Sequence, residues 1–388
     1  MADVLFEVTR DNLETGLRGY PVGYCTTSSV DPQKGLFYSG IPVDQLVDWD
    51  PIAVIYLLQS GKRGSVADVE EFKQELVKRS RCEEDLHASI RKLPRRAHPM
   101  QLFAMALVLA GVFEGKNDYC EDGINLIAKI PEIAATVINY HAGWNSLRPS
   151  DPSLGYMENF VHMLNPPGVE GAEQKRLCQV MRLFDILHFD HGGGNLSTFV
   201  GKAVASGLEN MYGSIAAAMH ALAGARHGGA NQDCLEFVQE IARQLGPHAT
   251  GEQVESLIDK KLNNNELVFG FGHAVLRVED PRATVLYDIA EQYYPDYPLV
   301  KIAGFLRTHG SKALQKRPKI ANPYPNIDAI SGILLTAAGL PHPEYYTVLF
   351  GMSRSVGIAL QIIYERCEAR DGKGTPIVRP KYIYKAKA

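Results

Sequence analysis

Apolar residues recur at helical spacing along most of this chain, and only residues 17–42 carry the signature of β-structure. Within that stretch, a turn at 31–34 precedes the short apolar run of residues 35–42. No alternation of strands and helices follows, which argues against a doubly wound sheet. The pattern therefore predicts a mainly α-helical protein with a short N-terminal β-hairpin.

Capping signals and apolar periodicity locate the expected helices. Asp50 precedes Pro51, and Gly61 follows one helix length later, so a helix is predicted between them. Ser65 and Asp68 resemble a capping box at the start of the next helix. Further helices are predicted over residues 100–113, 131–140, 172–190, 211–223, 252–264, 283–294, 299–308 and 346–367.

Several local features refine this assignment. The helix at 100–113 is apolar on every face, which predicts that it is buried. Residues 114–124 are expected to form a loop, after which Pro131 opens the next helix, and 145–167 read as a long loop with at most a short helix. Asn231 is placed to cap the helix that follows it.

Composition narrows the class of protein. The chain has 388 residues, of which 45% are hydrophobic and 22% charged, as in ordinary globular proteins. The formal net charge of −4 gives no electrostatic case for binding nucleic acid or an anionic membrane. The apolar runs are expected to be too short to span a bilayer.

The six cysteines are widely scattered, and none forms a short pair with metal-ligand spacing. They are read as reduced thiols in a cytosol-like compartment. The first ten residues contain no apolar signal core, so the sequence predicts a cytoplasmic protein.

Three histidines stand in glycine-rich loops. His273 lies in the stretch 270–282, His191 precedes three glycines, and His227 precedes two. Histidine is readily tuned to exchange protons near neutral pH, and glycines let the backbone approach a ligand closely. His227, just before a helix, is expected to be neutral and to donate a hydrogen bond. Taken singly, each loop could equally be a structural turn with a satisfied histidine, a flexible helix end or a capping loop.

Two charged residues stand in apolar surroundings. Asp328 begins a helix behind the proline-rich approach 322–327, and apolar neighbours would raise its pKa and make it a better base. Arg354 lies within a mostly apolar helix and requires an anionic partner. The alternatives are an ordinary N-terminal helix acid and an arginine paired with a structural carboxylate.

Together these motifs resemble those of the citrate synthase family, and the resemblance covers nearly the whole chain. The order and spacing look most like the branch that includes mitochondrial enzymes. The segments that carry it are residues 190–195, 226–232, 270–282, 325–329 and 345–354, together with 17–19 and 31–35.

The resemblance implies a multihelical two-domain fold and a homodimer. By position, residues 1–227 would form the first part of a large helical domain, 228–332 a small helical domain, and 333–388 the remainder of the large domain. The C-terminal tail would reach the partner subunit, where Arg379 would complete the oxaloacetate site.

The resemblance also implies the reaction and its residues. Family members join acetyl-CoA to oxaloacetate and hydrolyse the citryl thioester, without a metal or another cofactor. Asp328 would be the base, His227 the donor to the thioester oxygen, and His273 the group that protonates the oxaloacetate ketone. The oxaloacetate binders would be His191, Asn195, His273, Arg282, Arg354 and Arg379, and the coenzyme A contacts would be Arg277, Gly270, Phe271, Arg226 and Asn326.

The chain departs from the pattern of this branch mostly around the coenzyme site, so the acyl-chain choice stays open. 2-Methylcitrate synthase, which uses propionyl-CoA with the same catalytic groups, is the alternative enzyme, because one methylene is worth only about 1–3 kcal/mol of discrimination. A non-catalytic dimer that binds carboxylates or acyl-CoA is the alternative of another class. The mitochondrial matrix is the alternative location if a leader has been removed. The departures are Gly192, Ala225, Arg226, Phe269, Phe271, Ala321 and Ile330.

Overall fold

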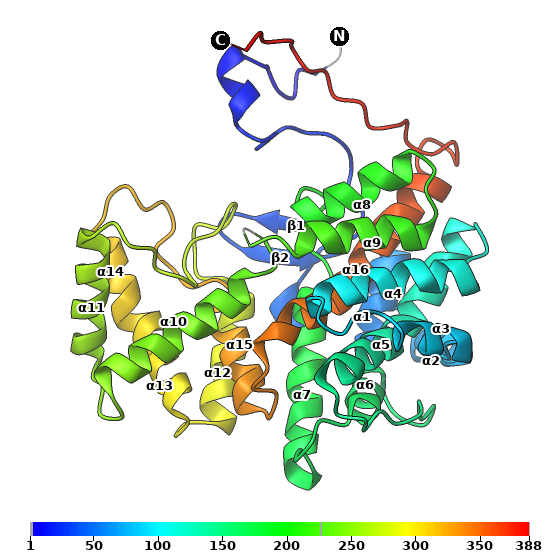
Figure 1. Ribbon diagram of the computed structural model, residues 1–388. Coiled ribbons are helices and arrows are strands. Elements are labelled where there is room, and N and C mark those ends of the chain that lie inside the picture. Colours follow the sequence, from blue (N-terminus) through cyan, green and yellow to red (C-terminus); the bar gives the residue numbers. More distant parts are fainter. Residues whose placement is uncertain (1–2, 226, 388) are drawn as a thin grey trace.

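The computed structural model describes residues 3–225 and 227–387, and helices dominate its fold (Figure 1). The α-helices are α1 Pro51–Ser60, α2 Val66–Arg79, α3 Glu84–Ile90, α4 Pro99–Glu114, α5 Tyr119–Ala142, α6 Tyr156–Leu164, α7 Gly171–His188, α8 Leu196–Ser206, α9 Met211–Leu222, α10 Ala230–Leu245, α11 Gly251–Asn263, α12 Pro281–Tyr293, α13 Pro298–Phe305, α14 Ser311–Gln315, α15 Asp328–Ala337 and α16 Tyr346–Ile363. Two π-helical turns, Leu306–Gly310 and Tyr364–Glu368, follow α13 and extend α16. The expectation of a mainly α-helical protein is confirmed.

The β-structure is a small antiparallel sheet of order β1-β2-β3. Its strands are Ser28–Asp31, Gly35–Tyr38 and Ile41–Pro42, so the predicted hairpin is present with one short strand added. The side chain of Asp31 closes the hairpin turn by accepting hydrogen bonds from two backbone N–H groups, at 2.8 and 2.9 Å.

The two predicted caps are confirmed. The Asp50 side chain accepts from the N–H of Ile52 at 2.7 Å, and Gly61 ends α1 in the left-handed conformation with φ 71°. Ser65 and Asp68 exchange reciprocal hydrogen bonds, which is the predicted capping box of α2.

Three local predictions were wrong. Residues 119–124 are helical, since Asp118 caps α5. Pro131 lies inside α5 instead of opening a helix, and the buried residues around it hold the helix together despite the lost backbone donor. Asn231 lies within α10 behind Gly229, and its buried amide donates to Ser331 at 2.5 Å instead of capping the helix.

Two apolar helices, α4 and α16, differ in burial. α4 was expected to be buried on every face, yet Val108 is 48% and Val112 73% exposed in the single chain. The segment 343–368 is long and apolar enough to cross a membrane, contrary to the prediction from run length, but 89% of its apolar window is buried inside the fold. It forms the core helix α16, which packs against α5, α7, α8 and α9.

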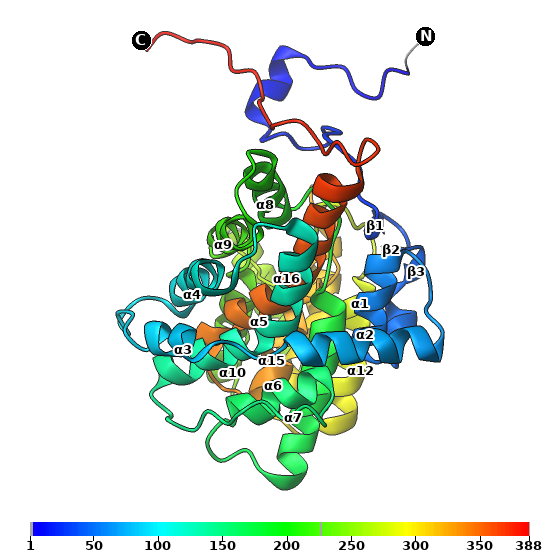
Figure 2. The same cartoon turned by 90° about the vertical axis from the view of Figure 1, so that its right-hand side faces the viewer.

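The helices form two groups in space. α10 to α15 gather on one side of α16 in Figure 1, and α1 to α9 lie on the other. The 90° view in Figure 2 shows both terminal segments extending beyond α8 and the end of α16. The predicted domain boundary at residue 332 falls inside α15, which packs against α10, α12 and α13 and ends at Ala337. The division into two domains stays a prediction.

Candidate active site

The predicted site residues stand at element ends around α16. His191 follows α7, His227 lies between α9 and α10, and His273 lies between α11 and α12. Asp328 is the first residue of α15, and Arg354 lies in the middle of α16. Hydrogen bonds and ring contacts connect these separate elements.

Main-chain contacts orient the His273 ring. Its Nδ1 accepts from the backbone N–H groups of Val275 at 3.0 Å and Leu276 at 2.9 Å. These bonds require an unprotonated Nδ1, so the proton of the neutral ring is assigned to Nε2. Burial lowers the pKa of His273 to about 4, with Arg282 adding to the effect, so the ring is neutral at physiological pH.

Glycines position the loop that carries His273. Gly270 and Gly272 both have φ of +80°, a conformation that disfavours other residues. A Cβ at Gly270 would lie 2.8 Å from the sulfur of Cys234 and 3.0 Å from the Cα of Ala329. The loop therefore packs directly on the start of α15, and this close approach excludes a larger residue.

His227 is held by the first turn of α8. Its Nε2 accepts from the Ser197 N–H at 3.2 Å and lies 2.9 Å from the Ser197 hydroxyl. This arrangement assigns the proton to Nδ1, which remains available as a donor. Burial, and then the charge of Arg354, lowers the pKa of His227 to about 4. The predicted neutral state follows, although burial rather than a helix terminus is the main cause.

The rings of His191 and His273 are tilted against each other by 59°, with centroids 5.2 Å apart. Burial, Arg282 and Arg354 hold the pKa of His191 well below its usual range. Its buried Nε2 has no hydrogen-bond partner among residues 3–225 and 227–387. Because buried polar atoms are normally satisfied, this atom is available for a ligand.

Asp190 fixes the backbone of His191. Its Oδ1 accepts from the His191 N–H at 2.9 Å and from the Gln361 amide at 2.8 Å. Its Oδ2 accepts from the hydroxyls of Ser28, at 2.7 Å, and Thr27. The buried carboxylate thus joins β1, α16 and the loop that presents His191.

Arg282 forms a two-point ion pair with Asp280, from Nε to Oδ1 at 3.0 Å and from Nη2 to Oδ2 at 2.7 Å. Both side chains are buried. Asp280 also caps α12 by accepting from the Arg282 N–H. The remaining Nη1 makes no hydrogen bond with the part of the chain that the structure describes. One edge of the Arg282 guanidinium is therefore available to a substrate carboxylate.

Arg354 is only 2% exposed. Its Nε donates to the His188 carbonyl at 3.0 Å, and its guanidinium carbon lies 4.8 Å from the centre of the Phe350 ring. No carboxylate among the described residues lies within ion-pair distance of it. Burial lowers the pKa of Arg354 to about 10, which still leaves the group charged.

Asp328 is tied to the His273 loop through Asn326. The Asn326 Oδ1 accepts from the Asp328 N–H at 3.0 Å, and its Nδ2 donates to the Gly272 carbonyl at 2.9 Å. Burial raises the pKa of Asp328 to about 6, although the nearby Arg282 opposes the rise. Its apolar surroundings predicted this direction.

The structure leaves some predicted ligands committed to the protein itself. Asn195 caps α8 by accepting from the Thr198 N–H at 3.0 Å, and its amide donates to Gly192. The Nη1 of Arg277 donates to carbonyls of its own loop, at 2.8 to 3.3 Å. Asn326 supports the loop as described above. These contacts indicate positioning roles, and their contacts with substrates stay predictions.

Other predicted residues lie away from the histidines or cannot be placed. Phe271 is half-buried and packs near Gly310. Arg379 is exposed in the tail, where the neighbouring Val378 N–H donates to Ser206 at 2.9 Å. The single chain therefore does not bring Arg379 to the site. Arg226 lies outside the described residues.

The sequence did not single out four residues that shape the site. Ser197 orients His227, Phe350 lies beneath Arg354, Asp190 anchors His191 and Asp280 pairs with Arg282. The Asp-Pro signal of a helix start could have identified Asp280 as a cap. The other three depend on contacts between distant segments.

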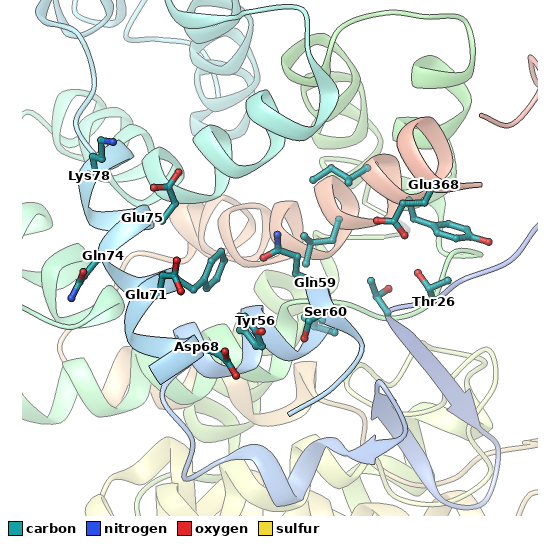
Figure 3. Close-up of a pocket in the computed structure, with 16 residues that line it drawn as sticks. Thr26, Tyr56, Gln59, Ser60, Asp68, Glu71, Gln74, Glu75, Lys78 and Glu368 are labelled. Atoms are coloured by element: carbon teal, nitrogen blue, oxygen red, sulfur yellow. The ribbon is translucent and has the colours of Figure 1, made fainter. Parts of the chain in front are cut away.

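No group of three or more His, Cys, Asp or Glu side chains arranged to hold a metal occurs within residues 3–225 and 227–387. The expectation of a metal-free reaction stays a prediction. A groove of about 730 Å³ is lined by α1, α2 and the end of α16 rather than by the three histidines (Figure 3).

Known proteins resemble this chain over nearly its whole length. The family model for the citrate synthase C-terminal domain matches residues 16–381. The mitochondrial citrate synthase of Citrus maxima is 36% identical, covering 98% of this chain and 83% of that protein. The mitochondrial 2-methylcitrate synthase of Yarrowia lipolytica is 32% identical, covering 97% and 84%.

Solved citrate synthase structures also match this chain over nearly its whole length. The citrate synthase of Thermotoga maritima has a TM-score of 0.80 and 26% identity, over 97% of this chain and 96% of that one. The Thermoplasma acidophilum enzyme, in a ternary complex with carboxymethyl coenzyme A and oxaloacetate, has a TM-score of 0.81 and 26% identity, covering 97% of each chain. The chain belongs to the citrate synthase family of acyltransferases, which includes the tricarboxylic acid cycle enzyme, and has its multihelical fold.

Proposed function

We propose that this protein condenses acetyl-CoA with oxaloacetate and hydrolyses citryl-CoA to citrate and coenzyme A. The observation that carries the proposal is the buried Arg354, which lacks a carboxylate partner among the described residues and acts electrostatically on His191, His227 and Asp328. An uncompensated buried cation is costly, so a bound anion would stabilise the site. Oxaloacetate supplies two carboxylates, one for Arg354 and one for the free edge of Arg282.

The proposed chemistry uses the protonation states set by the surrounding contacts. The ionised Asp328 takes a proton from the acetyl methyl group, while the Nδ1–H of His227 donates to the thioester oxygen and stabilises the enolate. The enolate carbon then bonds to the ketone carbon of oxaloacetate. The ketone oxygen takes its proton from the Nε2–H of His273. Water finally cleaves the thioester, releasing citrate and coenzyme A.

The remaining binding roles are also proposals. His191 and Asn195 would complete the oxaloacetate site. Coenzyme A would lie along the loop 270–277 and Asn326, where the free part of the Arg277 guanidinium can meet a phosphate. Arg226 is proposed as a further phosphate contact. If Arg226→Ala left the affinity for coenzyme A unchanged, Arg226 would not be a phosphate contact.

We propose a homodimer in which Arg379 of the partner subunit reaches the oxaloacetate site. The apolar Ile377, Tyr382, Ile383 and Tyr384 of the tail are exposed in the single chain, as are Val108 and Val112 of α4. Exposed apolar groups of this kind mark contact surfaces. Light scattering should give twice the chain mass, and Arg379→Ala should weaken oxaloacetate binding.

The test of the activity is release of free thiol from acetyl-CoA by the purified protein. We expect release only when oxaloacetate is present. A protein that binds both compounds without releasing thiol would be the non-catalytic carboxylate or acyl-CoA binder instead. In that case the three catalytic positions would have been misassigned.

The Yarrowia lipolytica relative supports 2-methylcitrate synthase as the second candidate. Comparing kcat/KM for acetyl-CoA and propionyl-CoA with the same enzyme distinguishes the two. We expect acetyl-CoA to be preferred, within the roughly 10- to 200-fold that one methylene allows. A preference for propionyl-CoA would assign the second activity. The names of the relatives support a mitochondrial location, and the cytoplasmic expectation stays a prediction.

A further inference from the structure

A chain of polar contacts leads from Asp190 to the end of α16. The Gln361 amide donates to Asp190 Oδ1 at 2.8 Å, and its Oε1 accepts from Lys202 Nζ at 3.3 Å. The same ammonium group pairs with Glu365 Oε1 at 3.0 Å. These contacts connect α8, α16 and the π-helical turn that extends α16 to the carboxylate that directly precedes His191.

The chain of contacts is shielded from solvent. Asp190, Gln361 and Lys202 are all buried. Lysine is almost never buried unless it is paired, and the ion pair with Glu365 meets this requirement. Because buried polar groups depend on the protein for their hydrogen bonds, the removal of one member of the chain changes the bonding of the next.

The two neighbours of Gln361 fix the direction of its amide. An ammonium group carries only donors, so it faces Oε1, whereas an ionised carboxylate carries only acceptors, so it faces Nε2. A reversed amide would place its NH₂ group against Lys202 and its oxygen against Asp190, and both hydrogen bonds would be lost. Lys202 therefore determines which end of Gln361 meets Asp190.

The orientation of Asp190 in turn holds two backbone N–H groups of the loop that carries His191. Oδ1 accepts from the His191 N–H at 2.9 Å. Oδ2 accepts from the Ser28 hydroxyl at 2.7 Å, and the oxygen of that hydroxyl accepts from the Gly192 N–H at 2.7 Å. A rotated carboxylate would release both N–H groups, so the position of His191 depends on the carboxylate that Gln361 holds.

The same loop packs directly on the contact between Lys202 and Gln361. A Cβ added at Gly193 would lie 2.9 Å from Lys202 Nζ and 3.2 Å from Gln361 Oε1. A Cβ at Gly192 or Gly194 would meet no described atom within 4 Å. The loop backbone at Gly193 thus lies against the two atoms that form the hydrogen bond, which gives a physical reason for a glycine at this position.

We propose that Lys202 and Gln361 are positioning residues for oxaloacetate binding, which hold Asp190 in the orientation that presents His191 to the substrate. The inference rests on the proposed function, in which the unpartnered Nε2 of His191 contacts oxaloacetate. Lys202 and Gln361 act through Asp190 without contacting the substrate. Glu365 compensates the charge of the buried lysine.

Lys202→Met tests the proposal, because methionine keeps an unbranched side chain and removes the charged donor. We expect the KM and the calorimetric dissociation constant for oxaloacetate to rise about tenfold, as for the loss of one hydrogen bond to a charged ligand. The kcat and the KM for acetyl-CoA should change less than about twofold, since uniform oxaloacetate binding is what is lost. An unchanged KM for oxaloacetate would overturn the proposal.

The conservative variant provides the rescue. Lys202→Arg retains a charged donor for Gln361 and Glu365, so its KM for oxaloacetate should stay within about threefold of the wild-type value. A loss as large as that in Lys202→Met would show that the donor is not what matters, and would overturn the proposal.

Lys129→Met is the matched control for stability. Lys129 pairs with Glu114, and its side chain is 13% exposed, compared with 11% for Lys202. Both methionine variants should lower the thermal midpoint, because each leaves a glutamate without its partner. Only Lys202→Met should raise the KM for oxaloacetate. An equal rise in Lys129→Met would attribute the effect to general destabilisation and refute the positioning role.

A double-mutant cycle with Gln361→Met tests whether Lys202 acts through the amide. Gln361→Met alone should also raise the KM for oxaloacetate about tenfold. In that background Lys202→Met should add less than about twofold, because residues that act through one another have non-additive effects. Additive effects would show that Lys202 does not act through Gln361.

Failure of the proposed function and failure of this inference give different results. If the proposed function is wrong, the wild-type protein releases no thiol in the presence of oxaloacetate. If only the positioning role is wrong, the wild-type protein is active and its KM for oxaloacetate is unchanged by Lys202→Met and Gln361→Met.

Discussion

The raised pKa of Asp328 gives a pH dependence that can be calculated from the structure. The base must be ionised, and burial raises its pKa to about 6. About one-tenth of the enzyme is then competent at pH 5 and nearly all of it at pH 8, so kcat/KM should rise about tenfold between these values. His227 and His273 have pKa values of about 4, so both are already neutral in this range. They add no second inflection to the pH dependence of kcat/KM.

The assay is thiol release at low acetyl-CoA and saturating oxaloacetate, in buffers of constant ionic strength from pH 5 to 8.5. Asp328→Asn should lower kcat by about 10²- to 10⁴-fold, the usual contribution of a general base, while leaving oxaloacetate binding nearly intact. Asp68→Asn is the matched control, because this acid also stands in a first helical turn but its carboxylate accepts from the Ser65 N–H in a capping box.

The result that would refute the reasoning is a flat profile between pH 5 and 8, or activity that falls across this range. Either would show that Asp328 is not the titrating base. Lost oxaloacetate binding in Asp328→Asn would show that the residue holds the substrate instead.

Three further substitutions test other parts of the site. Arg354→Met should weaken oxaloacetate binding about 100-fold by calorimetry but raise the thermal midpoint of the free enzyme, because it removes an unpaired buried cation; a lower midpoint would contradict this. Asp280→Asn should cost about 3–5 kcal/mol in urea unfolding, since Arg282 loses its buried partner, whereas the exposed pair variant Asp296→Asn should cost under about 1 kcal/mol. Ser197→Ala should lower kcat about 3- to 10-fold with unchanged oxaloacetate affinity, and an unchanged kcat would remove the hydroxyl from the positioning of His227.

Local chemistry allowed much of the fold to be predicted. The caps at Asp50 and Ser65 and the hairpin turn at Asp31 are made by residues two or three positions apart. The neighbouring residues in the sequence were therefore sufficient to predict them. The motifs likewise identified the family and most candidate residues. The continuity of α5 through Pro131 was not predictable, because the packing that stabilises it comes from distant segments.

By itself, the sequence determined which chemical groups are available and which local elements carry them. Only the tertiary structure decided the ring proton assignments of His227 and His273, the pairing of Arg282 with Asp280 and the separation of Arg354 from the carboxylates of the described residues. The physical reason is that hydrogen-bond geometry and desolvation depend on which atoms surround a group in space. For these residues, most of those atoms come from parts of the chain that are far away in sequence.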